Sequence, residues 1–207
     1  AVLQEDFSIT GLNLLLVFQV NCPGCFLYAL PLANELFKEH RSQGLNVLGL
    51  STAFEDFHLN TLDNTRLLLE ESRFVGVTQQ VLRANGLESA AMDIPFSVAF
   101  DHVGRGDRVL TEADIDIIYQ SYSLSLNWPK EKHAVGRDRL QNHLFSQPLL
   151  AYTFTLNQLR GTPSWILFDD ELNILAQWFG HQPKPAVENL IAEVRQKKFL
   201  KVENSRK

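Results

Sequence analysis

The stretch LLLVFQVNCPGC, residues 14–25, places an apolar run directly before the chain's two cysteines. A run of this kind, residues 14–20 between Gly11 and a Cys-Pro turn, suits a strand buried on both faces of a sheet. Beyond the cysteines, apolar residues recur at helical spacing as far as His40: Leu27, Leu30, Leu32, Leu36 and Phe37. The cysteines are therefore expected at a strand-to-helix junction.

Cys22 and Cys25 stand three residues apart, so in a first helical turn their side chains share a face at a separation that a disulfide can bridge. Cys22, at or near the N-cap, would feel the helix dipole and unpaired N–H groups, which favour a thiolate. We expect Cys22 to be the nucleophile. Cys25, one turn deeper on the apolar side, is expected to be the resolving thiol that attacks a mixed disulfide at Cys22.

Three other interpretations of the two cysteines compete with a redox pair. A structural zinc site needs two further ligands, yet the chain has no third cysteine and only six scattered histidines. A permanent disulfide would close a loop too short to constrain the unfolded chain much. Two buried spectator thiols are also possible, although Pro23-Gly24 at a helix entrance exposes at least one of them. A redox pair is favoured over all three.

Length and charge narrow the class of protein. The 207 residues, about one and a half typical domains, predict a single domain, residues 1–207, that carries a large insertion. The composition is that of a globular protein, and a net charge of -5 argues against a nucleic-acid partner. The longest apolar run, residues 12–18, is too short for a membrane span. The chain begins at Ala1, so the compartment stays open: the cytoplasm is favoured, or the periplasm if a leader has been removed.

Further elements follow from periodicity and turn residues. Leu45–Ser51 is expected to be a second buried strand, joined to the first by a right-handed crossover. Helices are predicted at residues 62–74, 77–84 and 185–198, and strands at residues 96–100, 164–168 and 172–179. Residues 101–158 lose this clear period and are interpreted as a mostly helical insertion, with Thr111 capping a helix that runs to Tyr119.

Four segments resemble the thioredoxin-like superfamily, in particular its redoxin (AhpC/TSA and TlpA-like) group: VFQVNCPGC at 17–25, Leu30-Pro31, VLGLSTAFE at 47–55, and GTPS at 161–164. The resemblance covers roughly residues 12–60 and 159–195. It implies an α/β thioredoxin-like fold, a mixed sheet flanked by helices, with the insertion added. It also implies a thiol-disulfide oxidoreductase that acts on protein or small-molecule thiols and disulfides and needs no metal or organic cofactor.

The same resemblance assigns two more site residues. Thr162 and Pro163 match the segment with a cis-proline that packs against the cysteine pair and offers backbone groups to a substrate. Pro31 matches the proline that bends the family's active-site helix, since proline removes one helical hydrogen bond.

The chain also departs from the family. Asn21 stands where thioredoxins usually carry Trp, and residues 14–17 are apolar where they bury an acidic residue, so the general base is unassigned. Glu55 could lie near the site but is more typical of a solvated surface residue. The Pro-x3-Thr-x2-Cys pattern of peroxidases has Leu15 and Gln19 in its places, which disfavours a peroxiredoxin-like peroxidase.

The remaining alternative is a non-catalytic interaction module, in which the insertion supplies the partner surface. Apolar residues of the insertion are too numerous for a solvated loop and must pack on the core, on each other or on a second chain, so a homodimer is possible. Trp165 is expected either to line a substrate groove or to be a buried strand residue. Five histidines are expected to be ordinary surface residues: His58, His102, His133, His143 and His181.

Overall fold

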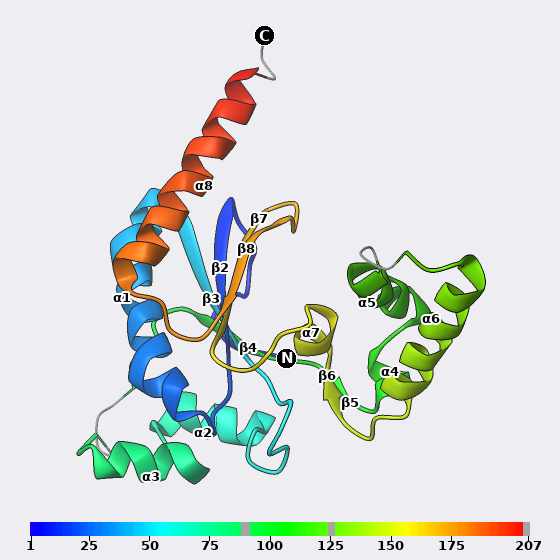
Figure 1. The fold of residues 1–207 in the computed structure, drawn as a ribbon. Helices are drawn as coiled ribbons and strands as arrows, with labels where there is room; N and C mark the ends of the chain where they lie inside the picture. Colours follow the sequence, from blue (N-terminus) through cyan, green and yellow to red (C-terminus); the bar gives the residue numbers. More distant parts are fainter. Residues whose placement is uncertain (88–91, 124–126, 205–207) are drawn as a thin grey trace.

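The computed structural model describes residues 1–87, 92–123 and 127–204, and its centre is a mixed sheet (Figure 1). Six strands lie in the order β1-β4-β3-β2-β7-β8. They are β1 (Val2–Gln4), β2 (Leu12–Phe18), β3 (Leu45–Ser51), β4 (Ser97–Phe100), β7 (Ser164–Asp169) and β8 (Ile174–Phe179). The β2–β3 and β3–β4 pairs are parallel, and the β1–β4, β2–β7 and β7–β8 pairs are antiparallel. The predicted α/β class with a mixed sheet is confirmed.

Strand β2 lies inside the sheet, and all seven of its residues are buried. The strand was predicted at residues 14–20, and β2 begins and ends two residues earlier. Pairing with β3 stops at Phe18 and Ser51, where the Phe18 carbonyl accepts from the Thr52 N–H at 2.9 Å. The chain therefore leaves the sheet three residues before Cys22.

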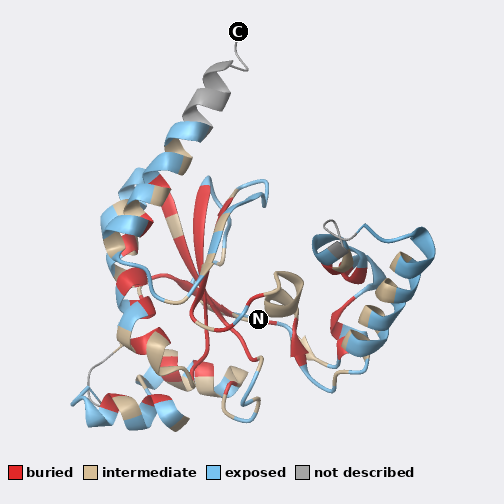
Figure 2. Cartoon of the chain, in the orientation of Figure 1, coloured by how far each residue is buried: buried red, intermediate tan, exposed pale blue. Residues whose placement is uncertain are grey.

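Helices flank the sheet. After Pro23 and Gly24 the chain forms a wide π-helical segment, η1 (Cys25–Ala29), and continues as α1 (Leu30–His40) and a short 3₁₀ turn, η2 (Arg41–Gln43). Helix α8 (Lys184–Asn204) lies beside α1, and α2 (Leu62–Glu71) and α3 (Gly76–Ala84) lie near the α1 end that follows the cysteines (Figure 1). Burial is concentrated in the sheet and in the helix faces turned toward it (Figure 2).

Three predicted helix ends are corrected, the simplest being that of α8, which continues past residue 198 to Asn204. Helix α2 ends at Glu71 and not at Phe74, because Ser72 adopts a left-handed conformation (φ 51°) and its N–H bonds back to the carbonyls of the last turn. Helix α5 (Glu112–Ser123) continues beyond Tyr119. At its start Thr111 Oγ1 accepts from the Asp114 N–H at 3.2 Å, while Asp114 Oδ2 accepts from the Thr111 N–H at 2.7 Å.

Between β4 and β7 the chain leaves the sheet and builds a second body, mostly of helices (Figure 1). Its elements are β5 (Val103–Gly104), α4 (Gly106–Val109), α5, α6 (Lys130–Phe145), β6 (Leu150–Ala151) and α7 (Tyr152–Leu156). It has a small core of its own, with Val109, Leu110, Ile115 and Leu150 at the centre. No helix in the described part of the chain is both long and apolar enough to cross a bilayer.

One buried carboxylate joins this body to the sheet. Asp101, which follows β4, is 5% exposed, and it accepts from Thr52 Oγ1 at 2.8 Å and from the Thr153 N–H at 3.0 Å. The ring of Phe54, in the loop after β3, stacks on Phe154 of α7 with 4.3 Å between centroids. These contacts, which we call the joint, hold the two ends of the second body to the sheet.

Candidate active site

The turn between β2 and Cys22 is held by the side chain of Asn21. Its Nδ2 donates to Asp56 at 2.8 Å and its Oδ1 accepts from the Val77 N–H at 2.7 Å, so it ties the turn to the loop after β3 and to the first turn of α3. Gly76 has φ +55°, and a Cβ there would collide with the Asn21 amide. Asn21, at the position where thioredoxins usually carry Trp, therefore shapes the turn through hydrogen bonds.

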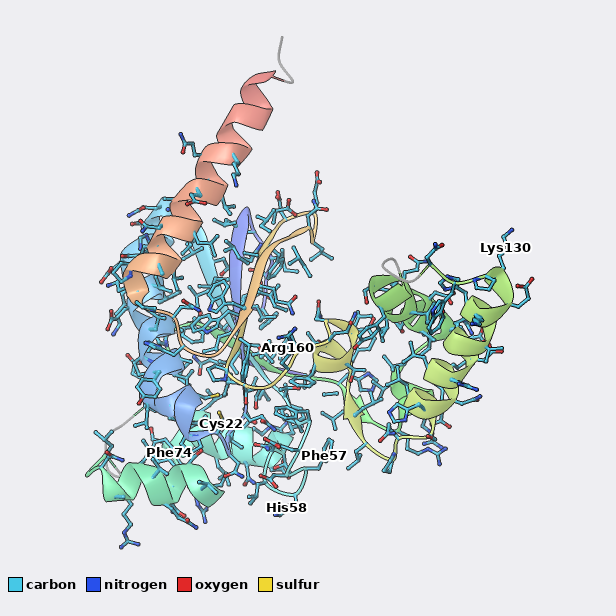
Figure 3. All side chains as sticks on the ribbon, in the orientation of Figure 1. Cys22, Phe57, His58, Phe74, Lys130 and Arg160 are labelled. Atoms are coloured by element: carbon cyan, nitrogen blue, oxygen red, sulfur yellow. The ribbon has the colours of Figure 1, made fainter. Side chains whose placement is uncertain are left out.

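The two thiols differ in exposure. Cys22 is half-buried at the start of the helical turns, and Cys25 is fully buried among core residues. Both are free, and the Cys25 N–H donates to the Cys22 carbonyl at 3.0 Å. One sulfur is thus partly accessible and the other is covered. Figure 3 labels Cys22 among the side chains of this part of the molecule.

Thr162 and Pro163 lie against this pair. Cys22 Sγ donates to the Thr162 carbonyl at 3.4 Å, across 140 residues of sequence. The Thr162–Pro163 peptide bond is cis, and a Cβ added at Gly24 would lie 3.9 Å from Pro163 Cδ. The four residues singled out from the sequence, Cys22, Cys25, Thr162 and Pro163, therefore meet at one place.

The surroundings move the two thiol pKa values in opposite directions. The Cys25 thiol makes the largest contribution, and with a hydrogen bond that the Thr162 side chain can offer and nearby backbone N–H groups it lowers the pKa of Cys22 to about 6 against the cost of burial. Burial, followed by the neighbouring Cys22, raises the pKa of Cys25 well above its ordinary value. Near neutral pH Cys22 is a thiolate and Cys25 a thiol.

A residue that the sequence did not suggest as part of the site lies beside them. Gln19 is 1% exposed; its Nε2 donates to the Glu55 carbonyl at 3.3 Å, and its Oε1 accepts from the Thr162 hydroxyl at 3.0 Å. Its only signal in the sequence was a polar side chain inside an apolar run. Glu55 contributes its carbonyl group here, and its side chain is exposed.

The helix that carries Cys25 is irregular. The wide turns Cys25–Ala29 run directly into α1, whose second residue is Pro31. Proline has no N–H to donate to the preceding turn, which fits an irregular helix at this point.

The other candidate side chains lie elsewhere. Trp165 is 1% exposed and stacks on Trp178 at 5.8 Å between centroids, so it is a buried strand residue and not part of a groove. Four of the five predicted surface histidines are exposed, and His133 is half-buried, bonded to the Tyr119 hydroxyl at 3.0 Å.

Metal-ligating side chains gather at a different place. Among the described residues, a close group of such side chains is formed by Glu39, His40 and Glu188. His40 Nε2 lies 3.1 Å from Glu188 Oε1, and the Lys184 ammonium group lies 2.6 Å from Glu39 Oε1. These residues connect α1 to α8 as an ion-pair network in which Lys184 supplies the positive charge.

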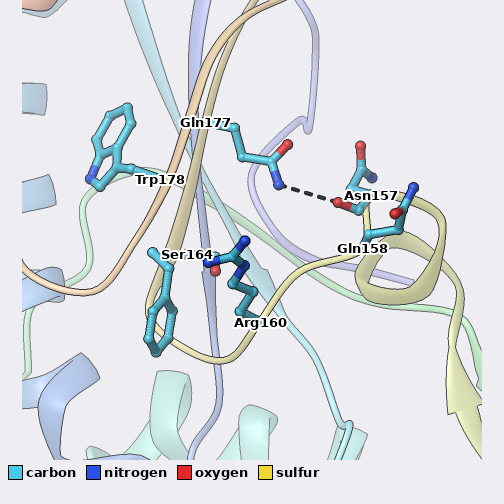
Figure 4. A pocket seen from close by; sticks show the side chains of 7 residues that line it. Asn157, Gln158, Arg160, Ser164, Gln177 and Trp178 are labelled. Atoms are coloured by element: carbon cyan, nitrogen blue, oxygen red, sulfur yellow. Dashed lines mark hydrogen bonds between the residues drawn. The ribbon is translucent and has the colours of Figure 1, made fainter. Parts of the chain in front are cut away.

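A polar pocket of about 420 Å³ flanks Thr162 and Pro163 on the side of β8 and α7 (Figure 4). Arg160 and Ser164 line it from either side of Thr162 and Pro163 in the sequence. The other lining residues are Asn157, Gln158, Gln177, Trp178 and Phe179. The lining thus contains one cationic side chain and no carboxylate.

Comparisons with known proteins bear on the fold. No family model matches the chain, and no curated protein sequence is similar to it. Among solved structures, a thiol-disulfide isomerase from Corynebacterium glutamicum is similar, with 20% identity, a TM-score of 0.55, and coverage of 93% of this chain and 89% of that one. A thioredoxin-like superfamily protein (18% identity, TM-score 0.47, 88% and 79% coverage) and StoA from Bacillus subtilis (10%, 0.42, 89% and 85%) also match. The chain has a thioredoxin-like fold.

Proposed function

We propose that the protein is a thiol-disulfide oxidoreductase of the redoxin kind, with Cys22 as nucleophile and Cys25 as resolving thiol. The observation that carries this proposal is the asymmetry of the pair: a half-buried thiol of pKa about 6 stands beside a buried thiol whose pKa is raised. A structural pair has no need of such a difference. Thiol-disulfide exchange does, because the first thiol must attack as a thiolate and the second must wait protonated.

The reaction balances without a cofactor. The Cys22 thiolate attacks one sulfur of a partner disulfide, the partner S–S bond breaks, and the departing thiolate takes a proton from solvent. In the resulting mixed disulfide, Cys25 attacks the Cys22 sulfur. A Cys22–Cys25 disulfide forms, and the second partner thiolate leaves with the proton of Cys25. The partner is thereby reduced by two electrons and the cysteine pair is oxidised; run backwards, the same steps oxidise a dithiol.

The partner would lie along the segment that carries Pro163. We propose that the main chain of Thr162 and Pro163 receives an extended partner segment beside Cys22, and that the pocket lined by Arg160 takes side chains next to the partner's cysteine. Arg160 favours anionic groups at that point, because the pocket lining carries no opposing carboxylate.

Reduction of insulin disulfides in the presence of dithiothreitol tests the proposal. The unaltered protein should accelerate the reaction, Cys22→Ser should abolish the acceleration, and Cys25→Ser should trap mixed disulfides that mass spectrometry can identify. If a protein with an intact, reducible Cys22–Cys25 disulfide gives no turnover and traps no partner, the non-catalytic interaction module replaces the oxidoreductase.

A further inference from the structure

The amide of Gln19 has a fixed orientation in the structure. Its Nε2 faces the Glu55 carbonyl, which can only accept, so its Oε1 must face the Thr162 hydroxyl. An amide oxygen can only accept, so the hydroxyl is the donor in that bond. The single hydroxyl hydrogen of Thr162 is thereby directed at Gln19.

The same hydroxyl belongs to a residue that lies against the thiols: the Thr162 carbonyl is 3.4 Å from Cys22 Sγ, and a hydrogen bond from the hydroxyl lowers the pKa of either sulfur. It can donate to either Cys22 or Cys25 when that sulfur is ionised. Because it has one hydrogen, it cannot donate to a thiolate and to Gln19 at the same time. If the hydrogen turns to a sulfur, Gln19 Oε1 loses its hydroxyl donor in a place where the side chain is 1% exposed, which is unfavourable.

We infer that Gln19 is a positioning residue: its Oε1 competes with the thiolates for the one hydroxyl hydrogen of Thr162 and so limits how strongly the site stabilises them. The inference deepens the proposed function and rests on it. A thiolate that is stabilised too strongly is a weaker nucleophile, since nucleophilicity falls as basicity falls. Gln19 keeps Cys22 ionised yet reactive in a chain whose residues 14–17, where thioredoxins bury an acidic residue, are all apolar.

Other charged groups near the turn are few. The facing loop between β3 and α2 carries Glu55, Asp56 and His58; Asp56 is bonded to Asn21, and the side chains of Glu55 and His58 are exposed. On the helix side, the groups that act on Cys22 are the Cys25 thiol and backbone N–H groups. The backbone of Gln19 also bonds to Cys25, but a substitution keeps that backbone group, so a change of the Gln19 side chain acts on the thiols through Thr162.

The test measures the pKa of Cys22 from the pH dependence of iodoacetamide alkylation, with the labelled peptide identified by mass spectrometry. Gln19→Met removes the acceptor at similar length and should lower the pKa by roughly half to one unit, that is about three- to tenfold more thiolate at a pH below it. Gln19→Glu offers a stronger acceptor and should raise it. Thr162→Val should raise it, Thr162→Ser should not, and Gln19→Met combined with Thr162→Val should behave as Thr162→Val alone.

Asn60 Nδ2 also donates to the Glu55 carbonyl, at 2.9 Å, so the loop keeps one bond when Gln19 is changed. Thr65→Val, a buried Thr-to-Val change at a hydroxyl bonded to Ser51, is the matched control and should leave the pKa of Cys22 unaltered. A shift of the same sign in Gln19→Met and Gln19→Glu, or a Gln19→Met shift that persists without the Thr162 hydroxyl, overturns the inference. The titration needs no turnover, so these outcomes are separate from failure of the insulin assay.

Discussion

The residues that meet at the cysteine pair come from distant parts of the chain, whereas the core of the helical body is assembled from one continuous stretch. Gln19 and Thr162 are 143 residues apart and touch because β2 pairs with β7. The core around Ile115 draws on residues between 109 and 152. The site thus depends on the register of the whole sheet, and the helical body depends mainly on itself.

We propose on this ground that residues 101–158 are an insertion into a single thioredoxin-like domain. The insertion selects partners, and the cysteine site at the edge of the sheet carries out the reaction. Helix α6 has no buried residue, and Ile117, Tyr122, Trp128 and Val135 are all exposed. Such a surface can vary without disturbing the core. The joint at Asp101 is the place where the two regions can influence each other.

The largest expected effect is a loss of stability, and it should differ between the core of the sheet and the core of the helical body. Leu16→Ala, at a fully buried β2 residue, should lower the free energy of unfolding by about 2–5 kcal/mol and increase hydrogen exchange throughout the sheet. Ile115→Ala, equally buried, should increase exchange mainly within residues 106–150. Hydrogen exchange measured peptide by peptide distinguishes the two. Equal loss of protection in the sheet for both variants would mean that the chain unfolds as one unit.

The same contrast explains what could be predicted from the sequence. Two strands could be predicted, in residues 14–25 and at Leu45–Ser51, because strands buried on both faces are mostly apolar. The cysteines mark the start of the helix that follows the first strand. The very short β1, β5 and β6 give no period to detect. Helix α6 was not predicted because the face that packs on the small core is only half-buried and has apolar side chains mainly near its end, at Leu140, Leu144 and Phe145.

The site could be predicted only in part, because some of its residues are close in sequence and others are brought together by strand pairing. Cys22 and Cys25 are neighbours in sequence, so local spacing was enough to suggest a pair. Thr162 and Pro163 entered through a family resemblance, since no local pattern links them to residue 22. The bond between Gln19 and Thr162 arises only when β2 and β7 are paired in register, and sequence spacing carries no sign of it.

The second expected effect is a change in the pKa of Cys22 when its neighbour Cys25 is substituted. The Cys25 thiol makes the largest single contribution to the low pKa of Cys22, so Cys25→Ala should raise that pKa by one unit or more, toward the ordinary value of 9.0. Cys25→Ser keeps a donor and should preserve most of the lowering. In the unaltered protein the alkylation rate should be nearly constant above pH 7 and fall about tenfold per unit well below the pKa of about 6. An alkylation midpoint near 9 in the unaltered protein, or equal effects of alanine and serine, would contradict this account.

Breaking the joint should have an intermediate effect. Asp101→Asn puts an NH₂ group where a carboxylate now accepts from several donors, including the Thr52 hydroxyl and the Thr153 N–H, and should cost about 1–3 kcal/mol in urea unfolding. Asp107→Asn, at an exposed carboxylate paired with Arg105, is the control and should leave the unfolding midpoint unchanged. If the two substitutions are equivalent, Asp101 does not hold the regions together.

The smallest expected effect is the change in turnover of a small disulfide when the helical body is removed. Strands β5 and β6 already pair, with Gly104 opposite Leu150, so an Asn-Gly turn can replace residues 105–149 and close them as a hairpin. Leu150→Thr should accompany the change, because that side chain loses its apolar cover. Turnover of bis(2-hydroxyethyl) disulfide should stay within about twofold, since separated sites rarely couple by more than a few tenths of a kcal/mol.

Activity on the natural partner should fall in the same variant, because the surface proposed to select the partner is gone while Asp101, Thr153 and Phe154 of the joint are retained. Comparing the two disulfides in one protein separates chemistry from selection. An unchanged pKa of Cys22 would show that the variant keeps an intact site. If small-disulfide turnover is nevertheless lost, residues 105–149 contribute to the reaction itself, and the division of labour between sheet and insertion is wrong.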